Sequence, residues 1–187
     1  MPIFQDHFLN NDNQWEMRND EYALLQITEG DFAYIFENRR ATRAWTTWQP
    51  VLMEHQNAYK VHCVIERVGG MGRGFGMIWR CTDELNCHSF EINKRAEYTI
   101  RQCIDGEWWP LRDWLPAHCI NAGTRSLNEL LVVQQDTQTQ FFINGTLVDT
   151  VKLPLLGTDN GFGFVVRGQQ RIRIHSTLVL NVAESIE

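Results

Sequence analysis

The chain has 187 residues, of which 43% are hydrophobic, and this is enough to build one hydrophobic core. Its formal net charge is −6, so it lacks the basic surplus that nucleic-acid-binding proteins collect on one face. No stretch approaches the roughly 20 apolar residues that span a bilayer, and the first residues do not resemble a secretory signal. We therefore expect one soluble, cytoplasmic domain over residues 1–187, with no nucleic-acid or membrane partner.

The cysteine pattern gives no sign of a metal centre. The five cysteines are an odd number and contain no CxxC pair, so neither a zinc site nor a closed disulfide framework is predicted. We interpret them as reduced thiols; a disulfide between Cys81 and Cys87, which flank one hairpin loop, is the alternative. Asp83 and Asn86 in that loop could contribute to a calcium site, but such a site needs about six oxygen ligands. A solvated turn is the prediction, and no cofactor or metal ligand is assigned.

The first third of the chain has the pattern of strands separated by polar turns. Residues 4–8 predict a short opening strand, and residues 22–28 and 32–36 predict a hairpin. The aromatic-rich segment 44–53 contains Pro50, so it suits an edge strand or a loop better than a central strand.

Residues 59–68 predict a long strand because their side chains alternate between two different faces. The apolar face consists of Tyr59, Val61, Cys63 and Ile65. The mixed face consists of Lys60, His62, Val64 and Glu66. We expect His62 to lie near the polar surface of the strands that follow.

The stretch 74–101 predicts three consecutive antiparallel strands. If the four polar residues after the first strand form its loop, Trp79 lies opposite Phe90. A three-residue second loop then places Phe90 opposite Ile100, whereas a two-residue loop would place it opposite Arg101. Because a one-residue shift moves every side chain to the other face, burial of the apolar side chains selects the three-residue loop.

The other face of these three strands is polar. One row on it consists of Arg80, Ser89 and Arg101, and the row beside it of Ile78, Glu91 and Thr99. These charged groups could hydrogen-bond a ligand, or they could form a solvated network of ion pairs. This face is the first place to look for a binding site.

The second half of the chain adds further strands. Residues 107–120 contain two prolines and three tryptophans, which predict extended chain without a regular ladder. Asn144 and Gly145 give a strong hairpin signal. The remaining strands are expected at residues 128–135, 139–143, 161–167 and 171–182. About a dozen short strands with regularly spaced turns predict an all-β fold, an antiparallel two-sheet β-sandwich.

Several short motifs resemble a known family. They are GFGMIWR at 74–80, WWPLRDW at 108–114, FFINGTLV at 141–148 and GFGFVVR at 161–167. Together they resemble the jelly-roll domains of the concanavalin A-like lectin and glucanase superfamily, in particular the laminin-G-like modules of bacterial proteins. The resemblance covers nearly the whole chain and implies a concanavalin A-like jelly roll. It leaves the activity open, because one fold hosts many unrelated activities.

Five tryptophans are expected in irregular segments, where their rings can face solvent: Trp45, Trp48, Trp108, Trp109 and Trp114. Sugar-binding modules use exposed aromatic rings as stacking platforms. The alternative is that the rings cap the open ends of the core, since large aromatic side chains are usually well buried. Trp108 and Trp109 are the best exposed candidates, because adjacent side chains in extended chain point opposite ways.

The favoured hypothesis is a non-catalytic binding module that recognises a glycan or a protein partner through its polar sheet face and exposed aromatic rings. Its candidate ligand-binding residues are Arg80, Glu91, Arg101, His62, Glu66, Trp108 and Trp109. A carbohydrate-active enzyme of the glycoside hydrolase type is an alternative; it would need Glu66 and Glu91 to flank one bond, about 5.5 Å apart in a retaining enzyme. A structural or assembly domain is the other alternative. No catalytic residue is assigned.

Overall fold

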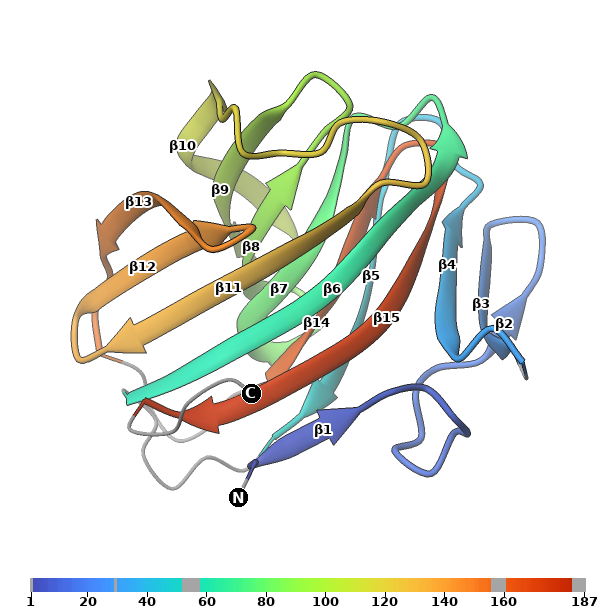
Figure 1. Cartoon of the computed structure of the whole chain (residues 1–187), viewed down its shortest axis with the longest axis horizontal. Helices are drawn as coiled ribbons and strands as arrows, with labels where there is room; N and C mark the ends of the chain where they lie inside the picture. The colour runs from blue at the N-terminus through green and yellow to red at the C-terminus, as the bar shows by residue number, and fades with distance from the viewer. Residues whose placement is uncertain (1, 29, 52–57, 156–160, 183–187) are drawn as a thin grey trace.

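The computed structural model describes the chain except for residues 1, 29, 52–57, 156–160 and 183–187. The described residues form fifteen β-strands, arranged as two antiparallel sheets that face each other (Figure 1). No helix long and apolar enough to cross a membrane occurs in these described segments. The fold is a jelly-roll β-sandwich, which confirms the predicted fold class.

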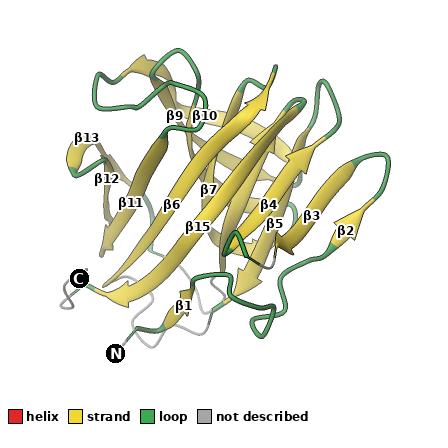
Figure 2. Cartoon of the chain, turned by 45° about the vertical axis from the view of Figure 1, so that its right-hand side comes forward, coloured by secondary structure: helices red, strands yellow, loops and turns green. Residues whose placement is uncertain are grey.

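Each sheet is completed by a strand from the end of the chain. The nine-stranded sheet has the order β13 (Thr146–Lys152), β12 (Gln138–Ile143), β11 (Leu127–Gln135), β6 (Ala58–Gly70), β15 (Gln170–Asn181), β4 (Ala33–Asn38), β3 (Ala23–Thr28) and β2 (Arg18–Asn19), with β1 (Phe4–Asp6) paired to β15. The six-stranded sheet has the order β10 (Glu107–Pro116), β9 (Glu97–Ile104), β8 (Asn86–Ile92), β7 (Gly74–Asp83), β14 (Gly161–Arg167) and β5 (Ala44–Pro50). Figure 2 shows the first sheet lying over the second. Because β15 separates β6 from β4 and β14 separates β7 from β5, neither sheet is complete until the C-terminal strands are in place.

The hydrophobic core lies between the two sheets. The predicted apolar face of β6 is fully buried, with no exposed surface on Tyr59, Val61, Cys63 or Ile65. From the six-stranded sheet, Phe90 and Trp79 contact Phe141 of β12, with ring centres 5.1 and 5.4 Å apart. Burial of each large apolar side chain contributes about 1.5–3 kcal/mol. The alternation of apolar residues therefore sets which face of each strand turns inward.

The register of the central strands is partly as predicted. Strands β8 and β9 pair as expected, but Phe90 of β8 lies opposite Met77 of β7, where Trp79 was predicted. Between Trp79 and Asp83, β7 contains two more residues than the facing part of β8, and Arg80 adopts a φ of +53°. A shift of two residues keeps each side chain on its face, so the predicted core is correct. The irregularity changes only the surroundings of Arg80 and its neighbours.

The tryptophan-rich segments are edge strands. This agrees with the prediction of an edge strand or a loop for residues 44–53, and it corrects the prediction that residues 107–120 lack a regular ladder. Strand β5 holds Trp45 and Trp48, and strand β10 holds the other three candidate rings. They are the outermost strands of the six-stranded sheet. Prolines are tolerated there because no further strand needs their missing N–H, and β10 adapts through irregularities on both sides of Arg112.

Gly76 in β7 offers a test of the sheet geometry. A Cβ at this position would lie 2.0 Å from the backbone oxygen of Phe90 in β8. We expect Gly76→Ala to destabilise the protein by about 3 kcal/mol, the upper end for overpacking, because a backbone atom cannot rotate away. Gly69→Ala is the matched control, since a Cβ there meets no atom within 4 Å. Urea denaturation of both variants checks this, and equal stabilities would contradict the described β7–β8 approach.

Candidate functional site

The outer face of the six-stranded sheet is strongly curved. Trp108 lies on β10 and Arg167 on β14, with β9, β8 and β7 between them. In a flat sheet these two strands would be about 19 Å apart. The Cζ of Arg167 nevertheless lies 4.2 Å from the centre of the Trp108 ring. The two side chains lean toward each other and the sheet curves toward this side, so we call this outer surface the concave face.

Glycines leave room for large rings on the floor of the concave face. Strands β7 and β14 both begin with Gly-Phe-Gly, so the phenylalanines turn inward and the glycines outward. A Cβ at Gly161 would lie 2.5 Å from the Trp48 ring, and a Cβ at Gly74 would lie 2.8 Å from the Trp114 ring. Trp48 and Trp108 also pack on a buried patch of small and apolar side chains, Ile78, Cys81, Cys87, Cys103 and Val165. Tryptophans from the two edge strands thus form the walls.

The concave face holds a buried ion pair between Glu91 and Arg167. Nε and Nη2 of Arg167 donate to Oε2 and Oε1 of Glu91 at 2.7 and 2.9 Å, and the Ser89 hydroxyl donates to the same Oε1 at 2.5 Å. The Glu91 side chain is 0% exposed and that of Arg167 is 14% exposed. This two-point pairing, together with the Trp108 ring over the guanidinium, fixes the plane of Arg167. Its remaining N–H groups therefore have a defined direction.

Sequence reasoning missed Arg167, although a signal was present. The motifs GFGMIWR and GFGFVVR both end in arginine, and the neighbouring strands β7 and β14 are antiparallel. The two arginines therefore end at opposite ends of the sheet, with Arg167 paired to Gly74. Only the second motif places its arginine beside Glu91.

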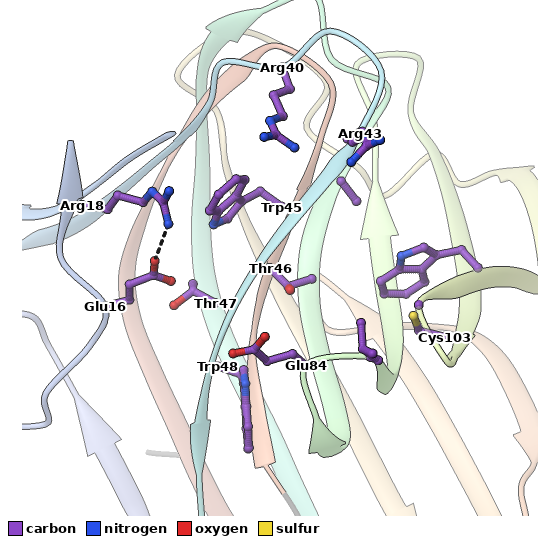
Figure 3. A pocket seen from close by; sticks show the side chains of 14 residues that line it. Glu16, Arg18, Arg40, Arg43, Trp45, Thr46, Thr47, Trp48, Glu84 and Cys103 are labelled. Atoms are coloured by element: carbon purple, nitrogen blue, oxygen red, sulfur yellow. Dashed lines mark ion pairs between the residues drawn. The ribbon is translucent and has the colours of Figure 1, made fainter. Parts of the chain in front are cut away.

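A groove of about 800 Å³ runs beside β5 and reaches Trp108 (Figure 3). On the concave side it is lined by Trp48, Cys103 and Trp108, and beyond the edge of β5 by Trp45 and Arg18. In Figure 3, strand β5 runs between Trp48 and Cys103 on one side and Trp45 and Arg18 on the other. We call this cavity the β5 groove. It adjoins the buried ion pair through the shared ring of Trp108.

Charged side chains in the β5 groove are partly neutralised. Arg18 lies 3.6 Å from the Glu16 carboxylate and 2.6 Å from that of Asp20. The hydrogen bond from Arg18 is the main reason that the pKa of Asp20 falls to about 2. Burial raises the pKa of Glu16 against the opposing effect of Arg18, and the charge of Glu84 raises it further. Arg18 is therefore already engaged by two carboxylates.

Two other predicted residues of the ligand site, Arg101 and Trp109, lie in different surroundings. The Cζ of Arg101 is 5.9 Å from the centre of the Trp114 ring on the concave face. Trp109 is 61% exposed, whereas its neighbour Trp108 packs on the patch below the groove. The two adjacent rings therefore point opposite ways, as expected for extended chain.

Arg80 lies away from the concave face, which corrects the prediction. The irregularity in β7 turns its side chain to the end of the sandwich, where the residue is 4% exposed and its Nη2 donates to the carbonyl oxygen of Pro154 at 2.5 Å. Within the described chain no carboxylate contacts it, and burial lowers the pKa of the Arg80 guanidinium. His88 nearby is also buried, and neither of its ring nitrogens has a hydrogen-bond partner among the described residues.

His62 and Glu66 lie on the outer face of the other sheet. Nε2 of His62 is 3.7 Å from Oε2 of Glu129, and Oε2 of Glu66 is 2.9 Å from Nε2 of His175. Burial lowers the pKa of His62, and Glu129 partly opposes this. The prediction that His62 lies near Glu91 is wrong, because β6 belongs to the nine-stranded sheet and β8 to the six-stranded one. A local strand pattern shows which residues share a face but not which sheet the strand joins.

The loop between β7 and β8 is a hydrogen-bonded turn. Asp83 Oδ1 accepts from the backbone N–H of Leu85 at 2.7 Å, and both carboxylate oxygens accept from the Asn86 side-chain amide at 3.0 Å. These bonds lower the pKa of Asp83, with the Leu85 bond contributing most. All five cysteines are free thiols, and Cys87 lies opposite Cys103.

Comparisons with known proteins support the fold. No described sequence family and no curated protein sequence matches the chain. Among solved structures, it resembles a Bacillus subtilis protein of unknown function with a galectin-like fold, with a TM-score of 0.66, 12% identity and coverage of 96% of each chain. It also resembles the carbohydrate-binding module CBM66 of Bacillus subtilis, with a TM-score of 0.59, 13% identity and coverage of 87% of this chain and 94% of the other.

A third similar structure belongs to a larger protein. This is the xylan β-1,4-xylosidase of Bacillus halodurans C-125, with a TM-score of 0.63 and 10% identity. The match covers 94% of this chain but 38% of the xylosidase. The chain has the lectin- and glucanase-like jelly-roll fold. At these identities the likeness concerns the fold alone.

Proposed function

We propose that this chain is a non-catalytic glycan-binding module that holds its ligand on the concave face and in the β5 groove. The observation that carries the proposal is the position of Trp108, whose ring lines the groove and lies over the guanidinium of Arg167. Aromatic rings stack on the apolar faces of sugars, while a few oriented polar groups bind their hydroxyls. Arg167, held by Glu91, supplies such oriented donors at the edge of the ring.

The structural likeness to a carbohydrate-binding module and to galectins supports this proposal. The laminin-G-like resemblance of the sequence motifs supports it as well. The hydrolase alternative that rested on Glu66 and Glu91 loses its basis, because these carboxylates lie on the outer faces of different sheets and cannot flank one bond. A protein partner in the same groove is the remaining alternative for a binding module.

The test compares two neighbouring tryptophans. A glycan array of the whole chain identifies a bound oligosaccharide, and isothermal titration then measures its affinity for two variants. Trp108→Ala removes the ring in the groove and is expected to weaken binding about tenfold, which corresponds to a loss of about 1.4 kcal/mol. Trp109→Ala changes the exposed ring that points the other way, and it should bind like the unchanged protein.

The variants also have to be folded for this comparison. Thermal unfolding followed by circular dichroism checks both, and Trp108→Phe keeps an aromatic ring if the alanine variant is unstable. The proposal is wrong if the array shows no glycan, or if Trp108→Ala binds as tightly as the unchanged protein. If the alanine variant does not fold, unchanged binding by Trp108→Phe together with weaker binding by Trp109→Ala contradicts the proposal as well.

A further inference from the structure

Two arginines of the β5 groove carry charges that the described chain does not neutralise. Arg18 in the same groove is paired with Glu16 and Asp20. By contrast, the guanidinium of Arg40 makes no ion pair or hydrogen bond with a described residue, and the guanidinium of Arg43, an exposed residue whose backbone carbonyl accepts from Asn38, makes none either. Each therefore has donors available to a ligand.

Arg40 is held in place by aromatic rings. Its Cζ lies 4.2 Å from the centre of the Tyr22 ring and 5.6 Å from that of Trp45. Stacking on rings orients the plane of a guanidinium without using its N–H groups, which point outward from the edges of that plane. The side chain is thus preorganised for an anion that accepts two parallel hydrogen bonds, and less conformational freedom is lost on binding.

The charges in the groove are separated along its length. Figure 3 shows Arg40 and Arg43 at the upper rim, whereas Glu84 lies at the lower end beside Trp48. The upper rim attracts an anion and the lower end repels one, while the tryptophans favour an uncharged sugar face. The whole chain has a formal net charge of −6, so long-range attraction does not account for anion binding. Any selectivity for anions must come from these local arginines.

We propose that the β5 groove selects glycans that carry an anionic group, a uronate carboxylate or a sulfate ester, which binds at Arg40 and Arg43. This inference rests on the proposed glycan-binding function and names its ligand class. The neutral part of the ligand extends along Trp48 and Trp108 toward the lower end of the groove. A carboxylate and a sulfate ester each present two acceptor oxygens to which a guanidinium can donate two parallel hydrogen bonds.

The experiment uses the whole chain and three oligosaccharides of equal length: an oligouronate, a sulfated oligosaccharide and a neutral one. Isothermal titration should show the anionic probes binding at least tenfold more tightly than the neutral one, as expected for hydrogen bonds to a charged group. Arg40→Gln and Arg43→Gln should each weaken binding of the anionic probes about tenfold. The control is Arg171→Gln, which removes the same charge from the nine-stranded sheet and should leave the affinities unchanged.

The outcomes separate this inference from the proposed function. Tighter binding of either the uronate or the sulfated probe than of the neutral probe supports the inference. The probe that binds more tightly identifies the anion. Equal binding of neutral and anionic probes, lost in Trp108→Ala, would overturn the inference and leave glycan binding intact. If no probe and no array glycan binds, both fail. Equal weakening of anion binding by Arg40→Gln and Arg171→Gln would also overturn the inference, because the effect would then reflect net charge. Since Arg43 is exposed, Arg43→Gln tests the same inference without a risk to folding.

Discussion

Glu91→Ala is expected to lower the free energy of unfolding by about 3–5 kcal/mol, because it leaves a charged guanidinium without its partner in a nearly closed environment. Arg167 is 14% exposed and gives two of its hydrogen bonds to Glu91, so water can replace little of what is lost. The Ser89 hydroxyl loses its acceptor as well. Urea denaturation at neutral pH measures the effect.

Two further variants serve as controls for Glu91→Ala. Glu129→Ala removes a carboxylate that is 61% exposed and lies 3.7 Å from His62, so we expect a change within about 0.5 kcal/mol. Replacing both Glu91 and Arg167 with leucine should recover most of the lost stability, because the unpaired charge is then absent. A loss for Glu91→Ala as small as that for Glu129→Ala would contradict the described burial of the pair.

His88 is expected to make the protein acid-sensitive. Burial, followed by the positive charge of Arg80, lowers the pKa of His88 to about 3. In the unfolded chain it takes up a proton near the ordinary value of about 6.5, so between these values the unfolded state binds more protons than the folded state. The free energy of unfolding therefore falls as the pH falls through this window, by about 1.4 kcal/mol per pH unit. Between about pH 6.5 and pH 4, His88 alone should lower the stability by about 3 kcal/mol.

The test for His88 compares how steeply the free energy of unfolding changes with pH in two proteins. Stability is followed by urea denaturation at several pH values for the unchanged protein and for His88→Gln, which does not titrate. Any misfit of glutamine shifts the whole curve and cancels in the slope, so the variant should lose stability less steeply on acidification. His118→Gln, at an exposed position, is the matched substitution and should follow the unchanged protein. Identical slopes for His88→Gln and the unchanged protein would show that the pKa of His88 is the same in the folded and unfolded states, which contradicts the expected acid sensitivity.

The sequence predicts much of the fold because burial acts locally. Alternation along β6 identifies the inward face, and the choice between two loop lengths before β9 follows from the same requirement. The irregularity in β7 has no comparable signal, since Arg80 is a non-glycine residue with positive φ. A four-residue loop and a bulge followed by a tighter loop both keep the apolar side chains inward. The pattern could not distinguish them, and Arg80 was misplaced as a result.

The candidate site depends on features that no strand pattern contains. Trp108 and Arg167 meet because the sheet curls across three intervening strands, and His62 lies far from Glu91 because β6 joins the other sheet. Of the predicted residues of the ligand site, Glu91, Arg101 and Trp108 share the concave face. Arg40, which lies over the Tyr22 ring and near that of Trp45, could not be singled out among the many arginines of the sequence.

The glycines on the floor of the concave face hold the two edge strands and their tryptophans close to the sheet. Gly74 and Gly161 are constrained by the rings above them, and a side chain at either position would displace a tryptophan. The rings themselves come from β5 and β10, whose outer edges pair with no other strand among the described residues. Exchanging Trp48 or Trp108 therefore alters the shape and chemistry of the groove while the strand ladder is retained. If the proposed function holds, ligand preference can change through substitutions on the two edge strands while the pairing of the central strands is kept.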